Sequence, residues 1–270
     1  MQHASDNWWV SGLVILLSLI IILKVVTAQR GRVPFIRRIP GLNAIDEAVG
    51  RATEMGRPVL MIPGPGGLAI ENLQGLAIFG YIARAVARFG NRTILPTADP
   101  IFNGVAEETI RDAYAESGRP ELVEDGDVRY LTGQQFAYAS GVAGILNREK
   151  PAASFMFGLF YAESLIFAET GQQIGAVQVA GTTETNQIPF LITACDYVII
   201  GDEFYAASAY LSNNATLLGS IVGQDYCKLI LGTLVLLGFI GLTIANSLTV
   251  MHHAVPQLLQ HTLKLFKYSG

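Results

Sequence analysis

The sequence predicts an α/β protein: a doubly wound, mostly parallel, Rossmann-like sheet of about six strands, flanked by N- and C-terminal transmembrane helices. Three observations predict this class. Short β-type runs alternate with helical stretches through the middle of the chain. These runs are continuously apolar, as in strands that helices cover on both faces. Two apolar stretches near the ends are long enough to cross a bilayer.

The first apolar stretch gives an N-terminal transmembrane anchor over residues 1–28. Its only charged residue between positions 8 and 28 is Lys24, whose ammonium group can reach the headgroups. A cleaved secretory signal is the competing interpretation. A signal peptide has basic residues before its apolar stretch, whereas no Lys or Arg precedes the stretch here. Trp8 and Trp9 fit an aromatic belt at the outer membrane surface.

A basic juxtamembrane linker over residues 29–42 follows and contains Arg30, Arg32, Arg37 and Arg38. Basic residues mark the cytoplasmic side of a membrane, so we expect the N-terminus outside and the next domain in the cytoplasm. The same arginines are expected to lie near anionic lipid headgroups.

The domain over residues 43–212 alternates strands and helices in the order that parallel sheets require. Several of its helical stretches end in Gly, as helix C-termini do. The expected strands, in chain order, are residues 58–63, 92–97, 127–131, 153–160, 176–181 and 197–201.

The C-terminal part is expected to form a linker (213–228), a second transmembrane helix (229–250) and an amphipathic tail helix (254–268). Gly238, Gly241 and Ala245 are small residues that let helices pack closely in lipid. The tail either lies outside the membrane or folds back along the bilayer.

The charge of the α/β domain is strongly negative. Residues 43–226 contain 10 Lys and Arg against 21 Asp and Glu, a net charge of −11. An acidic domain repels phosphate backbones, so nucleic acid is excluded as an expected partner.

A glycine-rich turn follows the first strand. Gly64, Gly66 and Ala69 fit the spacing G-x-G-x-x-G/A between a strand and a helix, where glycines let a pyrophosphate approach the helix N-terminus. Pro65 removes one amide donor, Glu71 would repel an anion, and no acid follows at the expected distance of about 20 residues. A tight turn without ligand is therefore the preferred interpretation over a nucleotide cradle.

Polar residues at the carboxyl ends of the strands are the other candidates for ligand binding, because open α/β sheets bind ligands there. The polar cluster 182–186 could instead cap the next helix through Thr185 or Asn186. The candidate ligand-binding residues are Gly64, Gly66, Gly67, Asp99, Glu184 and Asn186.

The sequence recommends no catalytic residue, metal ligand or cofactor. All four His lie outside the α/β domain, and there is no G-x-S-x-G motif or lysine of a P-loop. Cys195 and Cys227 are expected to be a buried thiol and a membrane-boundary residue, since disulfides are rare in cytoplasmic proteins.

Two helical regions carry more apolar surface than one face of a sheet needs. The helix over residues 71–90 and the stretch 153–168 are apolar almost all round, and exposed apolar patches mark partner surfaces. Phe79, Arg84 and Arg88 are therefore expected oligomer contacts, together with the small membrane residues. The alternative is a monomer with a deep core.

Four long runs resemble a known family: "IPGLNAIDEAVGRATEMGRPV", "QFAYASGVAGILNREKPAASFMFG", "AETGQQIGAVQVAGT" and "PFLITACDYVIIGDEFYAASAYLS". The chain is similar over roughly residues 39–224 to an uncharacterised family of bacterial and archaeal membrane proteins, domain of unknown function 6754. The resemblance implies a membrane-tethered α/β domain in a prokaryotic cell membrane. It implies no activity, cofactor or catalytic residue.

The sequence thus favours a non-catalytic scaffold or structural subunit with membrane lipids as partners. Its α/β domain would bind copies of itself or dock onto a membrane complex. The alternative is a small-ligand or nucleotide-binding sensor or enzyme that uses the crevice at the strand ends.

Overall fold

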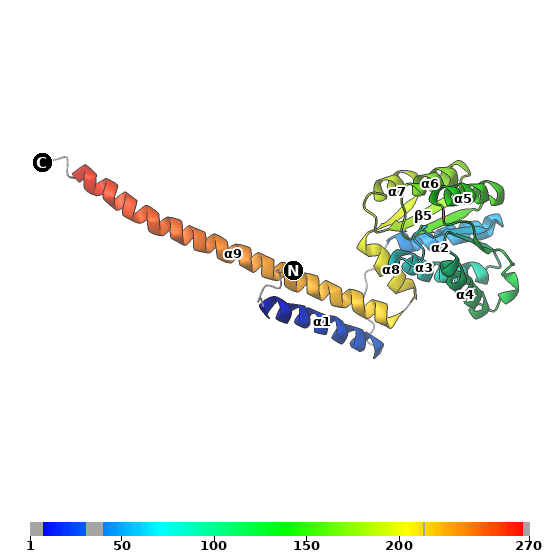
Figure 1. Cartoon of the computed structure of the whole chain (residues 1–270), viewed down its shortest axis with the longest axis horizontal. Helices are drawn as coiled ribbons and strands as arrows, with labels where there is room; N and C mark the ends of the chain where they lie inside the picture. The colour runs from blue at the N-terminus through cyan, green and yellow to red at the C-terminus, as the bar shows by residue number, and fades with distance from the viewer. Residues whose placement is uncertain (1–7, 31–39, 213, 267–270) are drawn as a thin grey trace. The chain divides into compact units, whose positions relative to one another are not determined.

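The computed structural model describes residues 8–30, 40–212 and 214–266, which belong to two compact units. One unit combines residues 1–30 with residues 219–270, and the other comprises residues 31–218. Figure 1 labels the α-helices of both units and strand β5. The second unit is the predicted α/β domain.

The domain contains a six-stranded sheet in the order β3-β2-β1-β4-β5-β6, and every neighbouring pair is parallel. All six predicted strands are confirmed, within three residues at each end. This order is that of a Rossmann-like, doubly wound fold, with its change of direction between β1 and β4. The strands are β1 (Val59–Ile62), β2 (Thr93–Thr97), β3 (Val128–Tyr130), β4 (Ala153–Phe157), β5 (Val177–Thr182) and β6 (Tyr197–Ile200).

Among the described residues, α-helices α3 to α7 and one short 3-10 helix connect these strands, α2 precedes β1 and α8 follows β6. The helices form layers on both sides of the sheet (Figure 1). One side carries α2 (Pro40–Met55), α3 (Ile70–Arg88), α4 (Pro100–Glu116) and α8 (Asp202–Ser212). The other side carries α5 (Gln135–Glu149), α6 (Glu163–Gln173) and α7 (Ile188–Ala194). The 3-10 helix η1 (Pro120–Leu122) precedes β3.

Two apolar cores lie on the two sides of the sheet, because successive strand residues point to opposite faces. In β1, Val59 and Met61 belong to the core under α2, α3, α4 and α8. Leu60 and Ile62 belong to the core under α5, α6 and α7. The continuously apolar strands therefore reflect burial on both faces, as the sequence predicted.

The expectation that α3 offers a large apolar surface to a neighbouring subunit is wrong. Phe79 is fully buried, and its ring lies 5.8 Å from that of Phe157 in β4, centroid to centroid. Helices α4 and α8 both pack against α3 and cover it. Arg84 forms an ion pair of 3.4 Å with Glu116 of the same chain, whereas Arg88 is exposed. The stretch 153–168 is likewise mostly buried.

The other unit contains α1 (Trp8–Gln29) and, from Gly219 onward, the 52-residue helix α9 (Ala215–Phe266). The predicted linker 213–228 is therefore helical from Ala215, and the expected second membrane helix and tail helix are one continuous helix. The basic linker is also shorter than expected, because α2 begins at Pro40, a residue that favours the first position of a helix.

Helices α1 and α9 pack antiparallel through two glycines of α9. A Cβ atom on Gly219 would lie 2.6 Å from Cα of Val25, and one on Gly223 would lie 2.9 Å from Cα of Ile21. Cys227 Sγ lies 3.6 Å from the carbonyl oxygen of Leu17. The spacing Gly219-x-x-x-Gly223 allows this close backbone approach.

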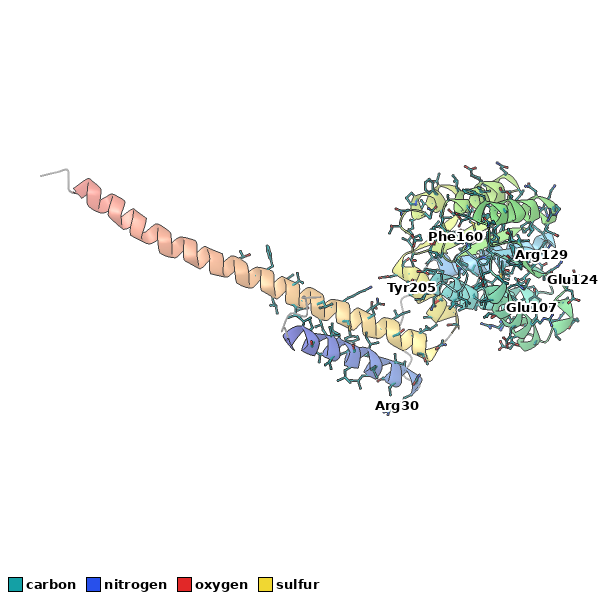
Figure 2. The ribbon with its side chains drawn as sticks, in the orientation of Figure 1. Arg30, Glu107, Glu124, Arg129, Phe160 and Tyr205 are labelled. Atoms are coloured by element: carbon teal, nitrogen blue, oxygen red, sulfur yellow. The ribbon has the colours of Figure 1, made fainter. Side chains whose placement is uncertain are left out.

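The small residues that the sequence analysis chose for helix packing are not those at this contact. A Cβ atom on Gly238 or Gly241 would meet no atom within 4 Å. The side chain of Ala245 lies outside the described residues, as do those of Trp8, Trp9, Arg32, Arg37 and Arg38. Lys24, expected at the headgroups, places its Nζ atom 3.8 Å from the centre of the Tyr226 ring. Arg30 is exposed just after the end of α1, at the position labelled in Figure 2.

Two helical stretches are long and apolar enough to cross a membrane: Val10–Gln29 in α1 and Ala215–Gly241 in α9. Large apolar side chains on both are exposed, among them Ile15, Val235 and Phe239. Such side chains suit contact with lipid tails better than contact with water.

We predict that leucine at Gly223 separates α1 from α9, because the Ile21 backbone leaves no room for a side chain. A Leu17→Cys substitution should form an intramolecular disulfide with Cys227 after mild oxidation of the full chain in lipid. Adding Gly223→Leu should reduce the yield of this disulfide about tenfold, by analogy with the loss of a close helix contact. The matched control, Gly238→Leu, should leave the yield unchanged, and equal yields in both variants would contradict this packing.

Candidate functional site

The candidate site lies at the carboxyl ends of β1 and β4, where a Rossmann-like sheet usually binds its ligand. Here the loop after β4 occupies the glycine-rich turn after β1. A Cβ atom on Gly64 would lie 1.6 Å from the carbonyl oxygen of Leu159, and one on Gly66 would lie 2.7 Å from Leu159 Cδ2. The two glycines therefore admit Leu159 at the place where a pyrophosphate would approach the turn.

Asn72, in the first turn of α3, holds this turn closed from inside. Its Nδ2 group donates to the carbonyl oxygens of Gly64 and Gly67, both at 2.9 Å. Its Oδ1 atom accepts from the amide of Leu159 at 2.9 Å. Because Asn72 is fully buried, its one amide satisfies backbone groups of two loops that are about 90 residues apart in sequence.

The helix N-termini at this edge already have carboxylates of the chain beside them. Asp99 is the N-cap of α4, and its Oδ1 atom accepts from the amide of Phe102 at 2.7 Å. Glu71 lies in the first turn of α3 and accepts from the hydroxyl of Tyr205 at 3.2 Å (Tyr205 is labelled in Figure 2). Burial, and then the Glu71 carboxylate, raise the pKa of Tyr205. Asp99 thus uses an amide at the start of α4 that a phosphate could otherwise contact, and Glu71 places a negative charge in the first turn of α3.

A second closure joins α5 to the sheet edge and to α6. The Tyr138 hydroxyl donates to the carbonyl oxygens of Pro63 at 2.8 Å and Pro96 at 3.2 Å, at the ends of β1 and β2. Burial, and then the charge of Glu163, raise the pKa of Tyr138 well above its usual value. Glu163 is itself fully buried and accepts from the Tyr161 amide at 2.8 Å and from the Gln135 side chain.

The remaining candidate ligand residues lie in the turn before α7, where Glu184 is half-buried and Asn186 is exposed. Neither Thr185 nor Asn186 caps that helix, because the N-cap is Gln187 and it makes no side-chain capping bond. Asn72, Tyr138 and Leu159 were not predicted from the sequence. The glycine-rich turn was a signal for Asn72 and Leu159, which contact it, whereas Tyr138 contacts Pro63 and Pro96.

Charge is distributed unevenly along this edge of the sheet. The six loops at the strand carboxyl ends, each taken with the first turn of the following helix, contain no Lys, Arg or His. They contain the six carboxylates Glu71, Asp99, Glu163, Glu184, Asp202 and Glu203. Anionic ligands are therefore disfavoured at this edge.

Exposed apolar side chains surround the closed turn, although the residues beneath them are buried. Phe160 of the loop after β4 points into the core at the position labelled in Figure 2, whereas its neighbour Tyr161 is exposed. We call the exposed set the apolar rim. It comprises Leu68, Ile70, Ile101, Val105, Phe136 and Tyr161, which follow the four adjacent strands β1, β2, β3 and β4.

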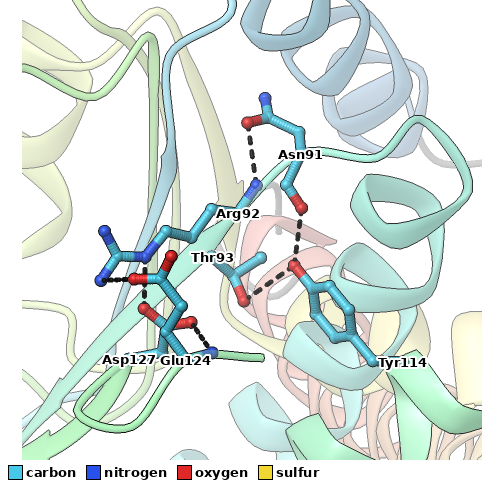
Figure 3. A network of polar contacts seen from close by, with 6 residues as sticks. All are labelled: Asn91, Arg92, Thr93, Tyr114, Glu124 and Asp127. Carbon is cyan, nitrogen blue, oxygen red and sulfur yellow. Dashed lines mark hydrogen bonds and ion pairs between the residues drawn. The ribbon is translucent and has the colours of Figure 1, made fainter. Parts of the chain in front are cut away.

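A polar network at the opposite edge of the sheet has a structural role (Figure 3). Arg92 Nε lies 2.5 Å from Asp127 Oδ1, and the Tyr114 hydroxyl donates to the carbonyl oxygen of Asn91 at 3.0 Å. Burial raises the pKa of Asp127 although Arg92 opposes the shift, and burial raises the pKa of Tyr114 to about 12. The network joins β2 to the loop before β3 and to α4, far from the glycine turn along the strands.

A cavity of about 370 Å³ lies at the amino ends of β5 and β6 and is lined in part by Arg51, Gln178, Cys195 and Asp196. Burial, and then Asp196, raise the pKa of the Cys195 thiol to about 12, so this thiol is protonated at neutral pH. Among the described residues, no group of three or more His, Cys, Asp and Glu could hold a metal ion.

The fold and this edge together define an α/β protein of Rossmann-like topology whose usual ligand crevice is filled by its own side chains, with two helices of membrane-spanning length. The chain belongs to the family described as Domain of unknown function (DUF6754), whose model matches residues 2–253. The match therefore includes α1 and most of α9, beyond the residues 39–224 of the expected resemblance. No curated protein matches the sequence.

We predict that Asn72→Ala destabilises the domain by about 3 kcal/mol, because it removes the partner of three backbone groups, one of them buried and two half-buried. Thermal unfolding of the full chain in detergent should show a melting temperature about 6–12 °C lower. Asn147→Ala, which removes an exposed amide from α5, is the matched control and should change the melting temperature by less than about 2 °C. Equal effects of the two substitutions would contradict the closure role.

We predict slow alkylation of Cys195. A rise in pKa from 9.0 to about 12 lowers the thiolate fraction at pH 8 about a thousandfold, so iodoacetamide should react at least about a hundredfold more slowly than with the SDS-unfolded chain. Intact mass measured over time in a Cys227→Ser background gives both rates. Because the folded pKa exceeds the unfolded pKa, the thiol's contribution to folding stability is present below pH 9 and is lost as pH rises towards about 12. Similar rates in the native and unfolded chain would refute the prediction.

Proposed function

We propose that this protein is a non-catalytic, membrane-anchored scaffold whose α/β domain associates with further copies of the chain as a structural subunit of a membrane assembly. The observation that supports this proposal is that a closed turn and an exposed apolar surface lie together at the carboxyl edge of the sheet. The glycine turn is filled by Leu159 and tied by Asn72, while the side chains of the apolar rim remain exposed. A closed crevice beneath an exposed apolar surface suits binding to a protein better than binding to a small ligand.

The membrane anchors in this proposal are α1 and α9. Their exposed apolar side chains suit lipid, and the contact of Gly219 and Gly223 with α1 suits a helix pair within a bilayer. The four arginines between positions 30 and 38 favour a cytoplasmic α/β domain and an external N-terminus in a prokaryotic cell membrane.

The alternative function is a sensor or enzyme that binds a nucleotide or another small ligand at Gly64, Gly66, Gly67 and Asp99. It would require Leu159 to leave the turn and an anion to approach carboxylates that already lie at the helix N-termini. A thermal-shift screen of nucleotides and sugar phosphates tests it, because a ligand that binds the folded state raises the melting temperature.

The mass of the full chain in mild detergent or native lipid particles tests the proposed scaffold. We expect a defined oligomer at micromolar protein concentration by light scattering and native mass spectrometry. A monomer at that concentration would contradict self-association, and a nucleotide that raised the melting temperature of the monomer would support the alternative instead.

A further inference from the structure

We infer that the apolar rim is a docking surface for a second copy of this chain, which presents its basic and apolar stretch Arg30–Pro40. This inference rests on the proposed self-association and names its contact. It assigns a role to six exposed side chains that the closed crevice does not use.

The rim is one surface because its loops touch one another. A Cβ atom on Gly67 would lie 3.3 Å from Cγ of Asp99, which joins the loops after β1 and β2. A Cβ atom on Gly133 would lie 3.5 Å from the carbonyl oxygen of Ala98, which joins the loops after β3 and β2. Leu159 joins the loop after β4 to that after β1. Strand order thus brings residues from four separate loops together.

The side chains of the apolar rim are large and apolar, yet much of their surface is exposed. Ile70, Ile101 and Phe136 are each 65% exposed. Large apolar side chains that project from the first turns of neighbouring helices form a patch of the kind that marks a partner surface. An aromatic side chain such as Phe136 is typical of the few residues that contribute most of the binding free energy.

The charge around the rim selects the partner. Asp99 and Glu71 flank it, and no basic residue lies in the loops or first helical turns at this edge. Two rims would repel each other, and so would an anionic membrane surface. A segment that combines arginines with apolar side chains is complementary in both respects.

The chain itself contains such a segment. Four of its 18 basic residues lie between positions 30 and 38, interleaved with Val33, Phe35 and Ile36. Residues 31–39 lie outside the described residues, so their role as the partner segment is inferred from their sequence alone. The same segment is expected near anionic lipid headgroups, so the experiment must separate the two partners.

A direct binding experiment tests the contact in the full chain. The acceptor carries Arg32→Gln, Arg37→Gln and Arg38→Gln, so that its own segment does not compete, and is held in zwitterionic nanodiscs. The probe is a labelled synthetic peptide of residues 30–40, RGRVPFIRRIP, and fluorescence anisotropy reports binding. Adding Ile101→Ser and Phe136→Ser to the acceptor, which removes apolar contact without changing the charge, should weaken binding at least about tenfold. Both side chains are exposed, so thermal unfolding should be unchanged.

Phe89→Ser is the matched control, because Phe89 is 61% exposed and follows α3 at the opposite edge of the sheet. Peptide binding that survives Phe89→Ser and is lost with the rim substitutions supports the inference. No binding to the acceptor, or equal loss in control and rim variants, overturns it. Flotation with anionic vesicles that depends on Phe136 would make lipid the partner and also overturn it.

The outcomes for the two proposals can be told apart. If the full chain is an oligomer by mass and the rim substitutions change neither this mass nor peptide binding, the rim contact fails and the scaffold proposal stands. If the full chain is a monomer, both fail.

Discussion

The close contact between the turn after β1 and the loop after β4 is the constraint on which the rest of the domain depends. Only glycine fits at position 64, because the Leu159 backbone lies where a Cβ atom would be. Asn72 then supplies the hydrogen bonds that both loops lack. In this fold the same two loops usually separate to admit a ligand. Here they close the sheet edge, so that the exposed apolar groups above it belong to the loops and to the starts of the helices.

The sheet was predictable from the sequence because burial on both faces leaves continuous apolar runs between glycine-rich breaks. The start of helix α9 was predicted wrongly, because its glycines were interpreted as part of a linker. Asn214, Gly219 and Gly223 resemble the composition of a linker, but the two glycines are the points at which α1 approaches the helix. Their spacing of four residues was the available signal. Gly238 and Gly241, chosen from their place in the more apolar stretch, have no neighbour within 4 Å.

The position of the candidate site was predictable from the sequence, but its closure by residues of the chain was not. The ends of the strands could be located, and Asp99 lies at one of them as a helix cap. Leu159 and Tyr138 gave no signal, because an ordinary apolar or aromatic residue closes the site only after the strand order brings its loop or helix there. Phe79 shows the same limit. Its helix is apolar almost all round because α4 and α8 cover it together with the sheet, and sequence periodicity does not reveal how many layers a helix will meet.

Helix α9 has a consequence that follows from its length. A helix of 52 residues is about 78 Å long, whereas the hydrocarbon core of a bilayer is about 30 Å thick. A bilayer crossed by an upright α9 would therefore enclose less than half of the helix, and the remainder would reach past the headgroups into water.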